Sequence, residues 1–186
     1  VDSHHPIKNI LDLIQKIGQA RYISTFDASS GYWQTPVEKS QQWLTAFICD
    51  EGTFSWRRTP FGCKLAGYTY TKSLRIALQA VKDFTASYTD DAAVYSDSWS
   101  AHMKHLEKFL TEIARSGFTF NLPKCSFAQP EVKFVGRIVG SGMHRPEPSK
   151  VATVANLKRP ETKKEVRQMI GFFLHFACIA SYIPAY

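Results

Sequence analysis

A pair of adjacent aspartates, with a third 63 residues earlier, is the part of this chain whose residue types and spacing could do chemistry. Asp90 and Asp91 lie between two short runs of strand-favouring residues, 84–88 and 92–95. The pattern predicts a β-hairpin with both carboxylates at its tip. Taken alone, the pair is explained equally well by an ordinary turn, because aspartate favours turns by bonding its own backbone.

The third aspartate, Asp27, follows a predicted strand over 20–26. From that strand to residue 122 the predicted order is strand, inserted hairpin, helix, strand, strand, helix, strand. Without the inserted hairpin this is the split βαβ order of ferredoxin-like antiparallel sheets, an α+β fold. The first and third strands are then antiparallel neighbours at the centre of the sheet. We therefore expect Asp27 to meet Asp90 and Asp91 at one sheet edge.

Carboxylates that meet in this way repel one another and raise each other's pKa unless cations neutralise them. Oxygen ligands suit Mg²⁺, which keeps several waters and also binds substrate phosphates. Two such ions about 4 Å apart can activate a 3′-hydroxyl and stabilise a pyrophosphate leaving group. The combined pattern favours a site for two Mg²⁺ ions, with Mn²⁺ as a substitute, over a coincidental turn.

Hydrophobic periodicity and turn residues predict the other elements. They comprise a helix over 6–17, a hairpin with strands 44–49 and 53–58, a helix over 66–81, an apolar helical stripe from Met103 to Ile113 that ends at Gly117, a short strand near 118–122, a strand over 132–139 that turns at 140–142, and helices over 149–157 and 163–180. The last helix opens with a capping box formed by Thr162 and Glu165.

Composition indicates a folded globular protein, and its charge is one-sided. The 186 residues fit one medium domain, with or without a small appendage, and 44% of them are hydrophobic. Residues 1–100 carry 10 basic and 10 acidic side chains, whereas residues 101–186 carry 13 and 6, the whole excess of +7. A one-sided basic surface suits a polyanion such as nucleic acid, although a solvated basic face explains the charge equally well.

Histidines and cysteines give no metal pattern. His102 and His105 have no acidic or cysteine partner that would complete a metal site, so we expect surface positions, with Glu107 or Glu112 as ion-pair partners. There is no signal peptide and no run of about 18 apolar residues. The four cysteines are scattered and are expected to be reduced intracellular thiols in the core: Cys49, Cys63, Cys125 and Cys178.

Four ordered segments resemble the reverse transcriptases of gypsy-type LTR retrotransposons: 26–34 (FDASSGYWQ), 59–64 (TPFGCK), 88–91 (YTDD) and 132–136 (VKFVG). The resemblance implies a right-hand RNA-directed DNA polymerase. Its palm with partial fingers would span 1–143, with the fingers hairpin at about 40–62, and the start of its thumb would span 144–186. The implied partners are dNTPs and a primer on an RNA or DNA template, within a longer polyprotein that also contains RNase H and integrase.

The resemblance also implies a role for each matching residue. Asp27, Asp90 and Asp91 would bind the metal ions, and Lys124 would be a general acid near the pyrophosphate. The amides of Ser30 and Gly31 would face the triphosphate, Tyr32 would be a steric gate against the 2′-hydroxyl, and Phe61 and Gly62 would lie near the nucleotide. Phe134, Val135 and Gly136 match the primer grip. The ordinary alternatives are core aromatics for Tyr32 and Phe134 and a surface cation for Lys124.

Basic residues of the C-terminal half are expected to contact the nucleic-acid backbone: Lys133, Arg137, Lys158, Arg159, Lys163, Lys164 and Arg167. In the resembling family the basic fingers strands precede the position of Val1, so we expect salt-sensitive binding with weak extension. A non-catalytic nucleic-acid-binding remnant is the main alternative. An RNA-recognition module on the same sheet is disfavoured, because its basic and aromatic signature is absent.

Overall fold

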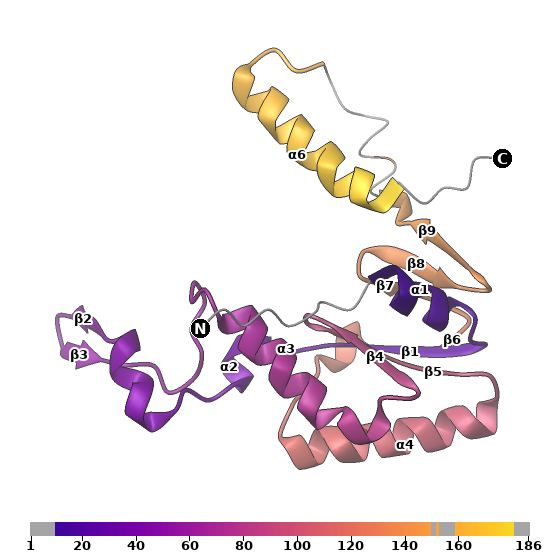
Figure 1. Cartoon of the computed structure of the whole chain (residues 1–186), viewed down its shortest axis with the longest axis horizontal. Coiled ribbons are helices and arrows are strands. Elements are labelled where there is room, and N and C mark those ends of the chain that lie inside the picture. The colour runs from indigo at the N-terminus through magenta and orange to yellow at the C-terminus, as the bar shows by residue number, and fades with distance from the viewer. Residues whose placement is uncertain (1–9, 150–151, 153–158, 181–186) are drawn as a thin grey trace. The chain divides into compact units, whose positions relative to one another are not determined.

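The computed structural model describes residues 10–149, 152 and 159–180, which divide into two compact units, Val1–His144 and Arg145–Tyr186 (Figure 1). The first unit contains α1 (Ile10–Gly18), β1 (Tyr22–Asp27), α2 (Gly31–Gln34), the short helix η1 (Lys39–Thr45), β2 (Phe47–Cys49), β3 (Gly52–Phe54), α3 (Ala66–Ala77), η2 (Gln79–Val81), β4 (Thr85–Tyr88), β5 (Asp91–Ser96), α4 (Trp99–Ser116), η3 (Leu122–Lys124), β6 (Ser126–Gln129), β7 (Glu131–Phe134) and β8 (Arg137–Gly140). Strand β9 (Met143–Pro146) crosses the boundary, and α6 (Lys163–Ala180) belongs to the second unit. The assignment of these units to palm and thumb stays a prediction.

The main sheet has the strand order β4-β5-β1-β6, with β1 and β5 antiparallel at its centre. This confirms the ferredoxin-like arrangement. The expected strand near 118–122 is wrong: Phe120 makes only an isolated bridge with Ala28, and residues 122–124 form η3 around Pro123. Proline cannot donate to a strand ladder, so the chain turns there and pairs with β1 only at β6.

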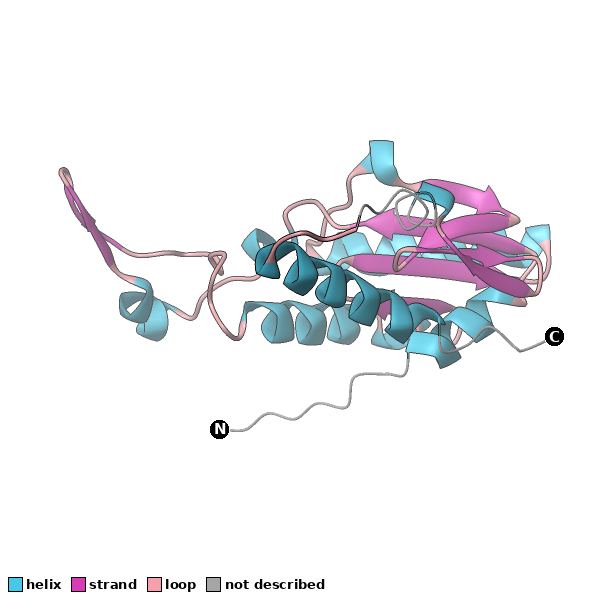
Figure 2. Cartoon of the chain, turned by 90° about the horizontal axis from the view of Figure 1, so that it is seen from above, coloured by secondary structure: helices cyan, strands magenta, loops and turns pink. Residues whose placement is uncertain are grey.

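Each face of the sheet is covered by its own core. Figure 1 shows α3 and α4 on one side of the sheet and α1 with the β7–β8 hairpin on the other. Side chains of β5 alternate between them, because Ala92 and Val94 pack with α3 and α4 whereas Ala93 and Tyr95 pack with α1. The β2–β3 hairpin projects away from this sheet (Figure 2).

The segment predicted as a single strand over 132–139 is a tight hairpin. Strands β7 and β8 pair from Glu131–Gly140 to Phe134–Arg137, and the turn consists of Val135 and Gly136. Both turn residues have positive φ, 47° and 70°, as two-residue hairpin turns of type I′ require. The alternating pattern was correct for both strands, but valine gives no sequence signal for such a turn.

Helix α4 contains a second departure from expectation, since His102 is fully buried rather than on the surface. Its Nε2 lies 2.8 Å from Ser24 Oγ and its Nδ1 lies 3.0 Å from Ser96 Oγ. Ser96 Oγ also lies 2.8 Å from Nδ1 of His105, and the amide of Ala128 donates to Ser24 Oγ. Neither expected glutamate pairs with these histidines; Glu112 instead binds Arg115.

One tautomer satisfies every member of this cluster. Ser24 donates to Nε2 of neutral His102, whose Nδ1–H donates to Ser96, which in turn donates to His105.

The expectation of core thiols is wrong for Cys49 and Cys63, which are exposed, while Cys125 is half-buried.

The second unit contains the predicted capping box. Glu165 N donates to Thr162 Oγ1 over 3.2 Å, and Thr162 N donates to Glu165 Oε2 over 3.3 Å, so the first turn of α6 is closed in both directions. Apart from residues 149 and 152, the helix predicted over 149–157 lies outside the described residues, as does Lys158. Within the described part of the chain, no helix is long and apolar enough to cross a membrane.

Candidate active site

The pairing of β1 with β5 brings the three aspartates to one edge of the sheet. Asp27 and Asp91 are register partners at the ends of these strands, and Asp90 occupies the two-residue turn between β4 and β5. The amide of Ala28 donates to the carbonyl of Asp90 over 3.0 Å, which fixes this turn against the end of β1. Residues 63 positions apart in sequence thus share one site.

Crowding perturbs these carboxyl groups. Burial raises the pKa of Asp91, and repulsion from Asp27 and Asp90 adds to it, while the backbone of Val135 and the charge of Lys133 lower it. Partial burial and repulsion from Asp27 raise the pKa of Asp90, although this residue lies at an exposed turn. Oxygen-only donors that repel one another fit a hard divalent cation.

The nearest cation contact is weak. Lys124 Nζ lies 3.5 Å from Asp27 Oδ1, and both side chains are substantially exposed. Solvent screens such a pair, so it offsets little of the repulsion. In the described residues, no three His, Cys, Asp or Glu side chains are grouped closely enough to enclose a metal ion by themselves. Waters and substrate phosphates would have to complete a Mg²⁺ shell here.

The loop after β1 passes close to the carboxylates. Ser30 has a left-handed conformation with φ 50°, and Gly31 then starts α2. A Cβ at Gly31 would lie 3.0 Å from Cζ of Tyr70 and 3.1 Å from Oδ1 of Asp90. Any larger residue at position 31 would have to displace the Tyr70 ring or the Asp90 carboxylate by a few tenths of an ångström.

Tyr32 follows on the same loop and packs at its outer side. Its ring centroid lies 5.3 Å from that of Phe61 and 6.1 Å from that of Tyr70, and the side chain is half-buried. Phe61 is 63% exposed, and Gly62 has a φ of 90°. The loop thus presents Tyr32 and Phe61 together, beside the amides of Ser30 and Gly31.

Gln34 is a functional candidate that the sequence did not reveal. Its amide nitrogen donates to the carbonyls of Ser29 and Thr119, and its Oε1 accepts from the amide of Thr119 over 2.8 Å. Its own carbonyl accepts from Arg58 over 3.0 Å. Gln34 therefore holds the loop after β1 to the segment after α4, and only its contacts identify this role.

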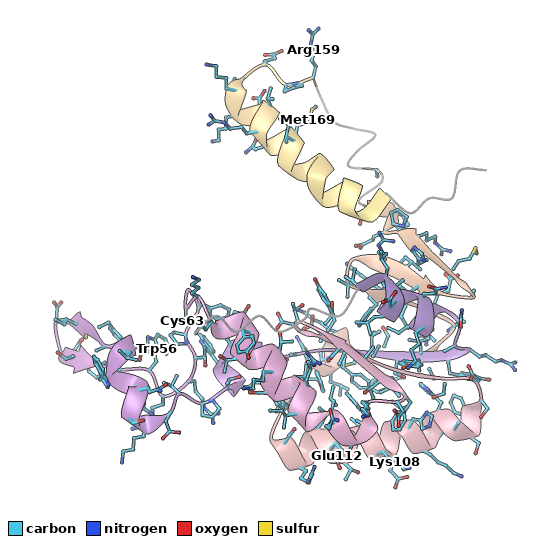
Figure 3. All side chains as sticks on the ribbon, viewed as in Figure 1. Trp56, Cys63, Lys108, Glu112, Arg159 and Met169 are labelled. Atoms are coloured by element: carbon cyan, nitrogen blue, oxygen red, sulfur yellow. The ribbon has the colours of Figure 1, made fainter. Side chains whose placement is uncertain are left out.

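An exposed aromatic surface continues from Phe61 toward the β2–β3 hairpin. Figure 3 labels Trp56 and Cys63 in this part of the chain. They line a pocket of about 370 Å³ together with Trp33, Leu44, Thr45, Ala46, Pro60 and Phe61. The surface is apolar, which is unusual for a monomer and typical of a contact site.

The β7–β8 hairpin reaches the carboxylate edge through its turn, since the backbone of Val135 bonds Asp91. Phe134 is 1% exposed and belongs to the core, whereas Lys133 is exposed. Arg137 is only 5% exposed, so its predicted contact with a nucleic-acid backbone would require its side chain to move, and that contact stays a prediction. The described cations of the second unit, Arg145, Arg159, Lys163, Lys164 and Arg167, are all exposed.

Three of the five non-glycine residues with positive φ in the described part of the chain lie at the site, whereas Ala128 and Ser141 lie elsewhere. Ser30, Thr89 and Val135 have φ values of 50°, 47° and 47°, in the left-handed region that non-glycine residues rarely adopt. One lies in the loop before α2, one in the aspartate turn and one in the β7–β8 turn. Such strain concentrates where function requires a particular geometry.

Known proteins with similar sequences are polyproteins. This chain is 29% identical over 184 residues to an enzymatic polyprotein of figwort mosaic virus (strain DxS), covering 98% of this chain and 27% of that protein. It is 27% identical over 187 residues to the retrovirus-related Pol polyprotein from transposon 297 of Drosophila melanogaster, covering 100% of this chain and 17% of that protein. The chain thus spans about a quarter or less of these relatives.

Solved structures with a similar fold include viral protease-reverse transcriptases. A foamy viral protease-reverse transcriptase in complex with double-stranded DNA matches with a TM-score of 0.83 and 25% identity over 95% of this chain and 31% of that one. The foamy viral enzyme in complex with an RNA/DNA hybrid matches with a TM-score of 0.79 and 26% identity over 92% and 24%. The family model described as reverse transcriptase (RNA-dependent DNA polymerase) matches residues 2–139. This chain therefore belongs to the reverse transcriptase family.

Proposed function

We propose that this chain is the catalytic part of an RNA-directed DNA polymerase that transfers a deoxynucleotide to a primer 3′-hydroxyl on a template. The observation that carries the proposal is the register pairing of Asp27 with Asp91, with Asp90 in the adjoining turn. Family membership supports it. The reaction is a nucleotidyl transfer, which depends on positioning and charge stabilisation rather than on a protein nucleophile.

The three aspartates are the residues that would hold two Mg²⁺ or Mn²⁺ ions. Their oxygen donors and mutual repulsion suit such ions. When bound, the ions would supply activation of the 3′-hydroxyl and stabilisation of the leaving pyrophosphate. Lys124, held beside Asp27, would donate a proton to that pyrophosphate.

The loop from Ser30 to Tyr32 would bind the incoming dNTP. The amides of Ser30 and Gly31 would bind its triphosphate, and the ring of Tyr32 would exclude a 2′-hydroxyl from the sugar site. Phe61 and Gly62 would contact the nucleotide and the templating base, since Phe61 packs on Tyr32 and Trp33 and is still 63% exposed.

The primer–template would lie along the β7–β8 turn. Phe134, Val135 and Gly136 would form the primer grip at this turn. Lys133 would contact the nucleic-acid backbone. The exposed cations Arg159, Lys163, Lys164 and Arg167 would contact phosphates of the nucleic acid, together with Lys158. Each phosphate neutralised releases counterions, so log K should fall with log[salt] by about 0.9 per contact.

We also propose that the chain derives from a gypsy-type LTR retrotransposon whose polyprotein contains RNase H and integrase. The ordered segments 26–34, 59–64, 88–91 and 132–136 support that subtype. Similarity to a Drosophila Pol polyprotein supports an origin in a longer chain.

Primer extension with dNTPs and Mg²⁺ or Mn²⁺ tests the proposal. We expect extension that requires the divalent ion and that Asp27→Asn abolishes, while Asp97→Asn, an exposed aspartate outside the site, leaves it unchanged. The assay should be run on residues 1–186 and on a polyprotein segment extended upstream, where we expect the stronger extension. Extension that survives Asp27→Asn in both would refute the mechanism.

A non-catalytic nucleic-acid-binding remnant is the second candidate, favoured by the concentration of the whole +7 charge excess in residues 101–186. It predicts salt-dependent binding of primer–template with no extension by either protein. Charge reversal at Lys163 and Lys164 should flatten the salt slope under both functions, so only the extension assay separates them.

A further inference from the structure

One polar group beneath the carboxylates has no partner in the fold. Tyr70 of α3 is 1% exposed, and its hydroxyl is buried without a hydrogen bond. A buried hydroxyl normally finds an acceptor, because leaving it unpaired destabilises the folded state. An exception of this kind in a native fold calls for a physical reason.

The surroundings of this hydroxyl point to the active site. A Cβ built on Gly31 would lie 3.0 Å from Cζ of Tyr70 and 3.1 Å from Oδ1 of Asp90, so the Tyr70 ring and the Asp90 carboxylate both border the space beside Gly31. Burial, with a smaller contribution from the charges of Asp90, Asp27 and Asp91, raises the pKa of Tyr70, so its hydroxyl keeps its proton and remains a donor.

The ring of Tyr70 is fixed by its neighbours. It packs edge-on against Tyr32 and Phe118, with centroid distances of 6.1 and 5.8 Å. These contacts need only the ring, which phenylalanine would supply equally well. The hydroxyl is therefore the part of Tyr70 that packing does not explain.

We propose that Tyr70 is a positioning residue whose hydroxyl donates a hydrogen bond to the carboxylate of Asp90 when that carboxylate binds a divalent cation. One carboxylate oxygen then faces the cation and the other accepts from Tyr70. In the free protein the Tyr70 hydroxyl has no hydrogen-bond partner, which lowers the stability of the fold. In return, the hydroxyl is already in place to orient the Asp90 carboxylate. The inference rests on the proposed function in one respect, that Asp90 is a cation ligand.

The test compares Tyr70→Phe with Tyr95→Phe, a chemically identical change at a hydroxyl that does have a partner, since Tyr95 donates to the carbonyl of Asp83 over 3.1 Å. Without divalent ions, we expect Tyr70→Phe to raise the melting temperature by about 2–4 °C and Tyr95→Phe to lower it. With Mn²⁺ titrated as the ligand, the stabilisation of Tyr70→Phe should require an ion concentration about tenfold higher or more, because a bond to a charged acceptor is lost. Tyr95→Phe should need the wild-type concentration.

Either of two results would overturn the inference: a lower melting temperature for ion-free Tyr70→Phe, or unchanged Mn²⁺ dependence. Asp90→Asn separates this failure from failure of the proposed function. If Asp90→Asn keeps the full Mn²⁺ stabilisation, Asp90 is no cation ligand and the metal site itself is wrong. If Asp90→Asn loses it while Tyr70→Phe keeps it, the metal site stands and only the role of Tyr70 is refuted.

Discussion

The polar groups of the two central strands, β1 and β5, are hydrogen-bonded to helix α4 in one region and repel one another in the other. At one end of β1 and β5, Ser24 and Ser96 form a closed hydrogen-bond cluster with His102 and His105 of α4. At the other end, Asp27 pairs in register with Asp91 beside Asp90, where the carboxylates repel one another. The same two strands therefore carry one region whose polar groups are hydrogen-bonded within the fold and one whose carboxylates repel one another.

This difference separates stability from function. A buried network with every donor and acceptor paired holds α4 to the sheet and gains nothing from a ligand. The carboxylate edge, with its strained turns and the unpaired hydroxyl of Tyr70, stabilises the fold poorly. Local violations of folding rules of this kind are expected where a protein binds and reacts.

Asp91→Asn should give the largest effect of the variants considered. It should lower polymerase activity without lowering the stability of the fold. Removing one charge from the repelling group should lower divalent-dependent extension by a factor on the order of 10³ or more. It should leave the free energy of unfolding unchanged or raise it, because repulsion is relieved. Primer extension and urea denaturation measure the two quantities. A loss of both activity and stability would show that Asp91 supports the fold.

His102→Ala should produce the converse result. It leaves the hydroxyls of Ser24 and Ser96 without their buried partner and opens a cavity, so we expect a loss of about 2–4 kcal/mol in the free energy of unfolding. His105→Ala, which removes the half-buried end of the cluster, should cost about 1 kcal/mol. Urea denaturation measures both. Equal costs for the two variants would contradict the central place of His102.

The aspartate site and the His102 cluster also differ in how well they could be predicted from the sequence. The meeting of the aspartates was predictable because the strand order alone places β1 beside β5, whatever the details of packing. The burial of His102 had a signal that was misread: it shares a helical stripe with Leu106, Phe109 and Ile113, all buried, whereas the predicted Met103 lies at the exposed margin. A histidine on an apolar stripe is more often a hydrogen-bonded core residue than a surface one.

Other features had no usable signal. Strand β6 has weak strand propensity and is held by pairing with β1 and by the bond from Ala128 to Ser24, both of which are tertiary contacts. The β7–β8 turn uses Val135, a residue that disfavours its conformation. The clamp by Gln34 depends on Thr119, 85 residues away. Each depends on partners distant in sequence, so local patterns could not reveal it.

The pH dependence of stability should have opposite signs at the two ends. The pKa of Asp90 and of Asp91 is raised above 3.8 in the folded state, so stability should fall as pH rises above that value, until both ionise when folded. Burial and the neighbouring His105 lower the pKa of His102 below 6.5, so stability should be lost as pH falls through 6.5. Together they predict a stability minimum between pH 3.8 and pH 6.5 when no divalent ion is present, because both contributions are lost there.

Variants assign the two limbs of this profile. His102→Gln should flatten the loss below pH 6.5, although His105, whose pKa is also lowered, keeps part of it. Asp91→Asn should flatten the fall that begins just above pH 3.8. Urea denaturation across pH 3.5–8 measures both limbs. A profile unaltered by either substitution would mean that these groups do not dominate the titration.

Thr89→Gly should give the smallest change in the free energy of unfolding, and it tests directly whether backbone strain in the Asp90 turn matters. Thr89 is exposed and holds a φ of 47°, which costs a β-branched residue about 1–2 kcal/mol, while glycine loses about 0.5–1 kcal/mol through its freer unfolded chain. The net expectation is a gain of about 0.5–1 kcal/mol in the free energy of unfolding, whereas Thr89→Ala, which keeps the Cβ, should change it little. Because the turn orients Asp90, the relaxed glycine variant should also need more Mn²⁺ for the same stabilisation. A variant that gains stability and binds Mn²⁺ as well as the wild type would mean that strain in this turn is incidental rather than part of the site.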